Sequence, residues 1–320
     1  MKAAVILQSG EVPPRCADFP EPVAGDGEVI VQVRAASLKP VDKQMAAGSH
    51  YASPRQFPFV CGTDGVGYLS DGQRVFFGGC RAPYGAMAER TVVPKAFTFP
   101  VPAELNDEIV AALPNPGVSA YLTLTFRAKL AAGENVLILG ATGVTGRLAV
   151  RMAKLLGAAR VVAAGRNQEA LSTLAQLGAD STIQLNLPPD DLRDAFSREA
   201  GASGFQVVVD YVWGQPTETL LSAITNQAFA EIGTETRLVQ VGESAGPAIL
   251  LPAAVLRSTA LTILGTGGIP GRQALSDSFR QVMDYAAQGE LQIDTIRVPL
   301  SEISNAWEQN PAGRRMVVIP

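Results

Sequence analysis

The sequence predicts an α/β protein in which a β-rich domain accompanies a doubly wound, parallel-sheet domain, and three observations support this. The length of 320 residues corresponds to two domains at roughly 100–200 residues each. The first hundred residues contain short apolar stretches separated by turn signals. From about Pro116 the pattern changes to strand, helix, strand, helix, which is typical of a parallel sheet.

In the first part, apolar and β-branched runs predict strands, and the Asp71-Gly72 pair predicts a tight hairpin between two of them. The strands are expected over 2–7, 28–37, 66–69, 74–77 and 85–93.

In the second part, buried strands are expected over 135–139, 160–164, 207–210, 238–242 and 260–264, with a closing strand over 316–319. Val144, Leu148, Met152 and Leu155 share one helix face. A second helix begins after Asn167 as N-cap and ends at Gly178, and a third covers 279–288.

Composition and charge exclude several functions. A net charge of −4 without Lys/Arg clusters is typical of a protein that binds no nucleic acid. No apolar run reaches the roughly 18 residues that a membrane helix needs. Cys16, Cys61, Cys80 and the single His50 stand at no metal-ligand spacing, and the odd cysteine number fits a reducing compartment. We therefore expect a cytoplasmic protein that acts on a small molecule.

A glycine-rich motif follows the strand over 135–139, at the start of a helix. Glycines at every third position let the backbone approach a pyrophosphate, and the helix N-terminus offers it free N–H groups. Gly146 would let the helix pack close to the strand. The alternative is an ordinary glycine-rich turn. The predicted cofactor contacts here are Gly140, Ala141, Thr142, Gly143, Val144 and Thr145.

The end of the next strand selects the cofactor. Sites for NAD place Asp or Glu there to accept the ribose hydroxyls. This chain has Gly165, Arg166 and Asn167, all three predicted cofactor contacts. The guanidinium of Arg166 matches a 2′-phosphate, although it also suits a solvated helix start. The sequence therefore favours NADPH over NADH.

Together with these residues, five further motifs give the sequence a family resemblance. They are Pro40-Val41-Asp42, Gly62-Thr63-Asp64-Gly65-Val66-Gly67, Gly117-Val118-Ser119-Ala120-Tyr121, Gly133-Glu134-Asn135-Val136 and Gly313-Arg314-Arg315-Met316-Val317-Val318. The chain resembles the medium-chain dehydrogenase/reductase superfamily, and within it the zinc-free quinone oxidoreductases.

The resemblance implies a GroES-like catalytic domain over 1–116 and 264–320, a Rossmann domain over 117–263, and an active cleft between them. In zinc-dependent members a metal-binding Cys precedes the segment matching Lys39–Asp42, and a histidine ligand stands where this chain has Thr63. Their cysteine-rich lobe is missing between Val93 and Pro116. We therefore expect no zinc, and we expect Cys61 to be a small buried residue.

The missing metal favours particular acceptors. Zinc polarises simple carbonyls toward hydride addition. Without it, quinones and α,β-unsaturated carbonyls accept hydride better, because conjugation spreads the developing charge. The nicotinamide would supply the hydride, and the protein would supply orientation and hydrogen-bond donors.

Four residues are candidates for catalysis. Lys39 either anchors an enolate or pairs with Asp42 or Asp64. Tyr51 either donates its hydroxyl to a substrate oxygen or is an ordinary loop residue. The catalytic candidates are Lys39, Asp42, Tyr51 and Thr63.

Further cofactor contacts are expected at the carboxyl ends of strands, where open α/β sheets bind ligands. In relatives a residue matching Ser119 lies near the nicotinamide, although helix capping explains it equally well. Arg315 either reaches a cofactor phosphate or is solvated. The additional candidates are Ser119, Tyr211, Val241, Gly242, Gly265, Thr266 and Arg315.

Three functions remain open. The first is an NADPH-dependent quinone reductase, the second an enoyl or 2-alkenal reductase, and the third a non-catalytic NADPH-binding sensor. The first is the one we expect. The strand over 260–264 also resembles the edge strand that pairs across a homodimer in relatives.

Overall fold

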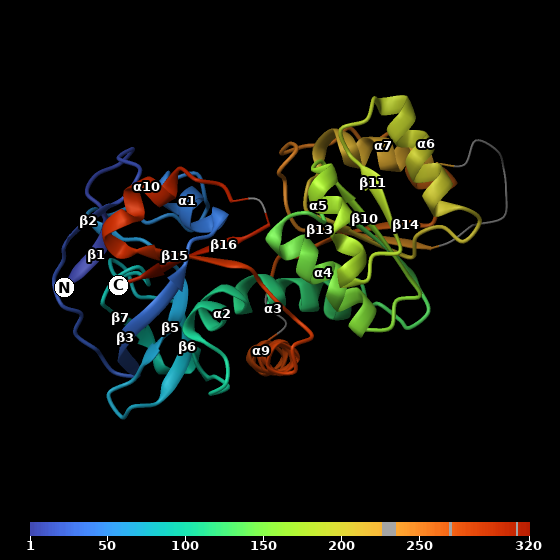
Figure 1. Ribbon diagram of the computed structural model, residues 1–320. Helices are drawn as coiled ribbons and strands as arrows, with labels where there is room; N and C mark the ends of the chain where they lie inside the picture. Colours follow the sequence, from blue (N-terminus) through green and yellow to red (C-terminus); the bar gives the residue numbers. More distant parts are fainter. Residues whose placement is uncertain (226–234, 269–270, 312) are drawn as a thin grey trace. The chain divides into compact units, whose positions relative to one another are not determined.

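The computed structural model describes residues 1–225, 235–268, 271–311 and 313–320, which divide into two compact units (Figure 1). The first unit is Met1–Asn115 with Met283–Pro320, and the second is Pro116–Val282. The chain returns to the first unit at Met283 rather than at the predicted residue 264. This return lies inside helix α9 (Arg272–Ala287), and a continuous helix carries no turn signal that marks a boundary.

Antiparallel pairing dominates the first unit. One sheet has the order β2-β1-β4, and a seven-stranded sheet has the order β15-β16-β3-β5-β6-β8 with β7 paired to β3. The strands are β1 (Lys2–Ile6), β2 (Arg15–Asp18), β3 (Glu28–Ser37), β4 (Phe59–Val60), β5 (Asp64–Tyr68), β6 (Arg74–Gly78), β7 (Arg90–Pro94), β8 (Thr98–Pro100), β15 (Thr295–Pro299) and β16 (Arg315–Ile319). The closing strand predicted over 316–319 is thus confirmed, and it pairs with β3.

Short helices complete this unit. They are α1 (Pro40–Ala46), α2 (Asp107–Ala112) and α10 (Ile303–Trp307), with 3₁₀ turns at η1 (Lys95–Phe97) and η4 (Leu300–Glu302). The core lies under them, where Ile6, Val31, Phe77 and Met87 are fully buried. Burial of this apolar surface, at roughly 25 cal/mol per Å², is the main stabilising term.

The hairpin at Asp71-Gly72 is confirmed. Strands β5 and β6 pair antiparallel, with Tyr68 opposite Arg74, and Gly72 adopts a φ of 85°. The strand predicted over 85–93 is wrong in its first half, since β7 begins at Arg90. The segment before it bonds elsewhere, because the Met87 N–H donates to the Cys61 carbonyl at 2.9 Å.

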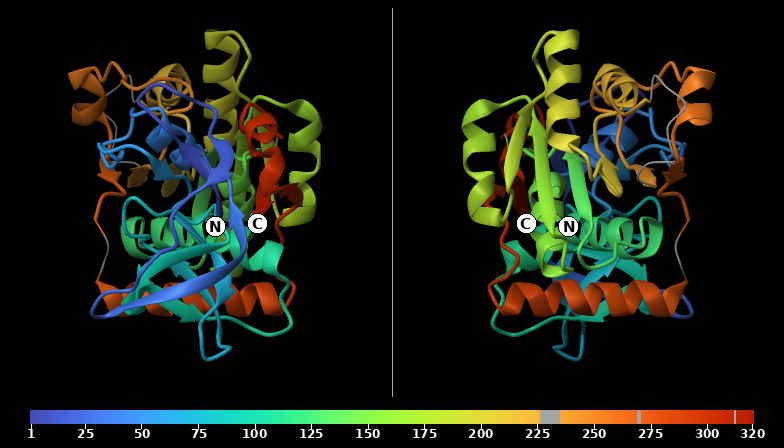
Figure 2. Two further views of the ribbon diagram at one scale, coloured as in Figure 1. Left: turned by 90° about the vertical axis from the view of Figure 1, so that its left-hand side faces the viewer. Right: turned by 90° about the vertical axis from the view of Figure 1, so that its right-hand side faces the viewer.

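The second unit is built on a six-stranded parallel sheet of order β11-β10-β9-β12-β13-β14. The strands are β9 (Asn135–Leu139), β10 (Arg160–Gly165), β11 (Ser181–Gln184), β12 (Val207–Asp210), β13 (Thr236–Gln240) and β14 (Leu261–Gly265). Five were predicted, while β11 was not, because Ser181 and Gln184 interrupt its apolar pattern. In Figure 2 (right) these strands run side by side with helices beside them.

The helices of the second unit include α4, which starts at the glycine motif. They are α3 (Pro114–Leu122), the π-helical turn η2 (Thr123–Arg127), α4 (Val144–Leu155), α5 (Gln168–Ser172), the 3₁₀ turn η3 (Leu174–Leu177), α6 (Pro189–Ala200), α7 (Gly214–Ile224), α8 (Ala253–Ser258) and α9.

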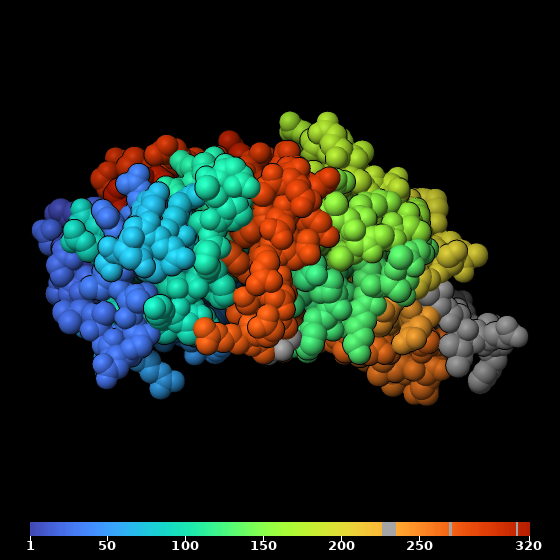
Figure 3. All heavy atoms as spheres, turned by 90° about the horizontal axis from the view of Figure 1, so that it is seen from below, coloured from blue at the N-terminus to red at the C-terminus, as the bar shows by residue number. Residues whose placement is uncertain are grey.

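Two helix-end predictions are confirmed. The Asn167 side chain accepts a hydrogen bond from the Ala170 N–H at 3.0 Å, and Gly178 adopts a φ of 102°. The predicted helix over 279–288 is the second half of α9. That helix buries Phe279 and Val282 and exposes Asp277 and Arg280. Its segment of the chain is coloured orange to red in Figure 3.

A substitution at Gly146 tests how closely α4 packs on β9. A Cβ there would lie 2.3 Å from the Gly140 carbonyl oxygen, whereas a Cβ at Gly143 would meet nothing closer than 3.5 Å. We expect Gly146→Val to lower the melting temperature by about 4 °C or more, since overpacking costs about 1–3 kcal/mol.

Gly143→Ala, measured beside it by calorimetry, is the control and should melt close to the wild type. Equal melting temperatures for Gly146→Val and the wild type would contradict the close approach of α4 to β9.

Candidate functional site

A sharp turn joins β9 to α4. Gly140 has a φ of 83°, and a Cβ there would meet the Val212 side chain at 3.0 Å. The N–H groups of Gly140 and Ala141 both donate to the Ala164 carbonyl at 2.9 Å. These bonds fix the turn, and the predicted role of Gly146 in close helix–strand packing is confirmed.

The N-terminus of α4 offers donors for an anion. Gly143 is its N-cap and makes no side-chain cap, so the N–H groups of the first turn lack the partner that Ser or Asp usually supplies. Gly143 is exposed, while Val144 and Thr145 are half-buried. The positive end of the helix dipole adds to this site. This cradle fits the pyrophosphate predicted for it.

The end of β10 holds Gly165, Arg166 and Asn167. A Cβ at Gly165 would lie 2.6 Å from Thr142, so these two residues pack together. Asn167 caps α5. Arg166 is exposed and makes no ion pair or hydrogen bond within the described ranges. Its guanidinium is therefore free to take a ligand.

The ends of β12 and β13 lie against each other. Asp210 is fully buried, and one of its carboxylate oxygens accepts from the Val212 and Trp213 N–H groups at 2.8 Å. A Cβ at Gly242 would meet the Tyr211 carbonyl at 2.7 Å. Asp210 thereby holds Trp213 at a φ of 55°, which is unusual for a residue with a side chain. Sequence reasoning missed this role of Asp210.

Burial changes the pKa values of two neighbours here. It raises the pKa of Asp210 above its usual value, against the opposing effect of the Thr217 hydroxyl. It also raises the pKa of Tyr211, whose hydroxyl is buried with no hydrogen-bond partner in this unit's described residues. Tyr211 lies beside Gly140, since a Cβ added at Gly140 would lie 3.1 Å from the Tyr211 Cβ. The Val241 N–H donates to the Asp210 carbonyl at 2.8 Å.

Three further predicted cofactor contacts, Gly265, Thr266 and Ser119, lie at the end of β14 and in α3. Gly265 ends β14 and has open space around it, and Thr266 follows half-buried. Ser119 lies in the interior of α3, which begins at Pro114, so its reading as a helix cap is wrong. The cap was misplaced because α3 starts at Pro114, earlier than the Gly117 motif suggests.

In the first unit, Lys39 lies in a buried ion cluster, which we define as Lys39, Asp42 and Asp64. Its Nζ is 2.8 Å from Asp64 Oδ1 and 3.3 Å from Asp42 Oδ2. It also donates to the carbonyl and the hydroxyl of Ser37 at 3.2 and 3.3 Å. Only 1% of the Lys39 side chain is exposed. Of the two predicted roles for Lys39, the geometry matches ion pairing with Asp42 and Asp64 rather than anchoring of an enolate.

The cluster organises Thr63. The Thr63 N–H donates to Asp42 Oδ1 at 3.1 Å, and its hydroxyl donates to Asp64 Oδ2 at 3.2 Å. Burial alone would lower the pKa of Lys39, but the two carboxylates outweigh it and raise that pKa. Burial raises the pKa of Asp42 despite the nearby ammonium. Lys39 therefore stays charged and holds both aspartates.

Arg315, predicted to contact the cofactor, is 7% exposed at the start of β16. Its Nη1 donates to the Leu38 carbonyl at 3.2 Å, while its Nε has no partner in the described residues. Burial lowers its pKa, against the attraction of Asp42 and Asp64. It thus lies behind the ion cluster and is not solvated, so the alternative of a solvated charge is wrong.

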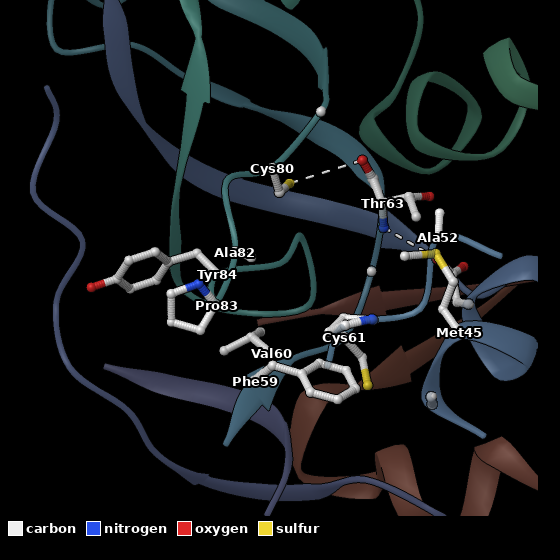
Figure 4. Close-up of a pocket in the computed structure, with 15 residues that line it drawn as sticks. Met45, Ala52, Phe59, Val60, Cys61, Thr63, Cys80, Ala82, Pro83 and Tyr84 are labelled. Atoms are coloured by element: carbon white, nitrogen blue, oxygen red, sulfur yellow. Dashed lines mark hydrogen bonds between the residues drawn. The ribbon is translucent and has the colours of Figure 1, made fainter. Parts of the chain in front are cut away.

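A cavity of about 300 Å³ opens within the first unit (Figure 4). Its lining is mostly apolar and includes Asp42 and Thr63 as its link to the ion cluster. The remaining residues are Met45, Ala46, Ala52, Pro54, Phe59, Val60, Cys61, Gly62, Gly79, Cys80, Ala82, Pro83 and Tyr84. Sequence reasoning missed most of them, because they come from segments without a motif.

Two thiols line this cavity. Cys61 is 3% exposed, as expected of a small buried residue, and Cys80 lies across from it in Figure 4 with its thiol directed at the Thr63 carbonyl, 3.9 Å away. Burial raises the pKa of both, that of Cys80 to about 12. Both thiols are therefore protonated near neutral pH.

Tyr51 is 96% exposed. Its ring lies against the His50 ring at a centroid distance of 4.1 Å. The structure does not bring Tyr51 to the ion cluster, although its neighbour Ala52 lines the cavity.

In the part of the chain that the structure describes, no group of three or more His, Cys, Asp and Glu side chains is placed to hold a metal ion. None of the helices there is both long and apolar enough to cross a membrane.

Family models match both parts of the chain. A model of the alcohol dehydrogenase GroES-like domain matches residues 25–103, and one described as zinc-binding dehydrogenase matches residues 144–288. The latter stretch contains neither cysteine nor histidine. The chain therefore belongs to the medium-chain dehydrogenase/reductase superfamily, with a GroES-like and a Rossmann-type domain.

Individual relatives place it more closely. Quinone oxidoreductase-like protein 2 of Mus musculus is 28% identical over 304 residues, covering 90% of this chain and 82% of that protein. The quinone oxidoreductase of Thermus thermophilus, also solved in complex with NADPH, has a TM-score of 0.80 and 29% identity over the whole of both chains. The chain thus falls in the quinone oxidoreductase branch.

A further relative is named for another reaction. Prostaglandin reductase-3 of Mus musculus is 28% identical over 240 residues, which is 72% of this chain. The present chain spans 59% of the length of that relative.

Replacing Lys39 separates its two predicted roles. Lys39→Met leaves two buried carboxylates without a cation, so we expect a loss of about 3–5 kcal/mol in the free energy of unfolding. Urea unfolding measures it, with Lys2→Met as the control, since Lys2 forms only an exposed pair with Asp18. A Lys39→Met variant with wild-type stability and lost activity would show that Lys39 acts on substrate instead.

Proposed function

We propose that the protein is an NADPH-dependent reductase that transfers a hydride to a quinone without zinc. The observation that carries this is Arg166, an exposed and unpaired guanidinium at the end of β10, in a Gly165-Arg166-Asn167 sequence that offers no carboxylate. A guanidinium fork binds a 2′-phosphate bidentately and gains little from a bare ribose.

The residues fit the rest of the cofactor. The uncapped first turn of α4 would hold the pyrophosphate, and Gly143 leaves room for it. Tyr211, Val241, Gly242, Gly265 and Thr266 stand at strand ends, where the remainder of the dinucleotide would lie. Bound NADPH supplies the hydride. Ser119 and Arg315 stay predicted contacts in this proposal.

The cavity would hold the acceptor. Its mostly apolar lining suits the ring of the acceptor, and Thr63, fixed by Asp42 and Asp64, marks the polar end of the cavity. Within the described residues no group of His, Cys, Asp and Glu side chains is placed to hold zinc, so an acceptor that spreads negative charge over a conjugated ring suits the site. This favours a quinone. An enone is the second candidate, because the exposed Tyr51 directly precedes Ala52, which lines the cavity, and its hydroxyl could serve as a proton donor.

We also propose a homodimer. Strand β14 pairs only with β13 and ends the sheet in the part of the chain that the structure describes. Leu250 and Leu256, 76% and 51% exposed, precede it. An unpaired apolar edge of this kind is usually covered. Sedimentation at the mass of one chain would exclude this dimer.

Arg166→Ala tests the proposal. We expect its KM for NADPH to rise about tenfold or more, because a hydrogen bond between charged groups contributes roughly 1.5–3 kcal/mol, while its KM for NADH stays unchanged. The assay follows cofactor oxidation with 1,4-naphthoquinone and, separately, cyclohex-2-enone.

Arg198→Ala is the control, since Arg198 is an exposed arginine on α6. Preference for NADH by the wild type would overturn the role of Arg166. Turnover of the enone alone would favour the second candidate over quinone reduction.

A further inference from the structure

The cavity of the first unit differs from most anion-accepting sites in its charge. None of its 15 lining residues is Lys, Arg or His, and its one ionisable carboxylate is Asp42. Its volume, about 300 Å³, is at the lower end for small-molecule sites. Met45, Phe59 and Val60 supply much of the wall seen in Figure 4.

Two cations that contact or attract the aspartates of the ion cluster, Lys39 and Arg315, do not reach a ligand. The Nζ of Lys39 is surrounded by four protein oxygens, and its side chain is 1% exposed. Arg315 is buried behind it and bonds to the Leu38 carbonyl. These two positive charges are matched by the negative charges of Asp42 and Asp64. An anion in the cavity would therefore lose its water and meet the Asp42 carboxylate without gaining a cation from the 15 lining residues.

The two cysteines that line the cavity are compatible with an electrophilic ligand, because their thiols are protonated. Cys61 is buried and Cys80 is half-buried, and Cys80 directs its thiol to the Thr63 carbonyl. A quinone or enone reacts with a thiolate rather than with a thiol. A protonated pair of cysteines lets such a ligand occupy the cavity without being trapped.

We propose that this cavity admits compact, uncharged quinones and enones and rejects acceptors that carry a negative charge. Carboxylated enones, sulfonated quinones and nucleotide thioesters are thereby excluded. This inference rests on the proposed function and names the substrate class of that same site.

The test compares 1,4-naphthoquinone with 1,4-naphthoquinone-2-sulfonate as acceptors for NADPH oxidation. The sulfonate withdraws electrons and makes the ring the better hydride acceptor. A lower kcat/KM for the sulfonate therefore reports weaker binding rather than lower reactivity. We expect kcat/KM to be at least tenfold lower for the sulfonate. Equal values for both would overturn the inference and leave the proposed function intact.

A charge placed at the cavity wall should change this ratio. Ala52 lines the cavity from an exposed loop, so Ala52→Lys should narrow the difference between the two quinones severalfold. Ala47→Lys adds the same charge at an exposed position outside the lining and should not change the ratio. An equal effect of both variants would contradict selection at the cavity wall.

Binding without turnover separates this inference from the proposed function. Calorimetric titration of the protein with 1-tetralone, an uncharged bicyclic ketone, and with 1-naphthoate needs neither NADPH nor reduction. Binding of the ketone at least tenfold tighter than the anion would support the inference even if no quinone were reduced. Equal or reversed affinities would overturn it.

Discussion

One buried carboxylate, Asp42, joins the segments around the cavity. Its Oδ2 accepts the Lys39 N–H at 2.8 Å and thereby starts α1, while its Oδ1 accepts the Thr63 N–H at 3.1 Å. The same carboxylate attracts the Lys39 ammonium, which in turn holds Asp64 at the start of β5. A buried carboxylate is costly unless it is paired in this way. The position of helix α1 and of the Cys61–Thr63 segment therefore depends on the Asp42 carboxylate, whose charge the Lys39 ammonium balances.

The second unit depends on a steric constraint instead. Gly140 and Gly146 leave α4 close enough to β9 that a Cβ at Gly146 would overlap the Gly140 carbonyl. Because α4 lies so close to β9, the free N–H groups of its first turn face the space at the carboxyl end of that strand. This unit offers positively polarised groups for a ligand, namely the N-terminus of α4 and the guanidinium of Arg166. The cavity of the first unit is mostly apolar and has no Lys, Arg or His among its lining residues, which agrees with the charged cofactor and the neutral acceptor proposed for the two units.

Local features of the sequence predicted much of the fold and of the proposed cofactor site. The glycine turn, the Asn167 cap and the Asp71-Gly72 hairpin depend on residues within a few positions of one another. The ion cluster was only one of two readings, because Lys39 and Asp64 are 25 residues apart and no periodicity links them. Arg315 meets Leu38 across 277 residues. The cavity was missed for the same reason, since packing of distant segments forms it. Tyr51 attracted interest as a proton donor in the sequence, yet it stands 96% exposed against His50.

The most direct test of the account is single-turnover oxidation of NADPH deuterated at the transferred C4 position, with 1,4-naphthoquinone and an excess of a zinc chelator. Direct hydride transfer predicts that deuteration slows the loss of NADPH absorbance severalfold and that the chelator has no effect. Loss of turnover with chelator and its recovery with added zinc would contradict the account, as would an absent isotope effect under conditions where hydride transfer limits the rate.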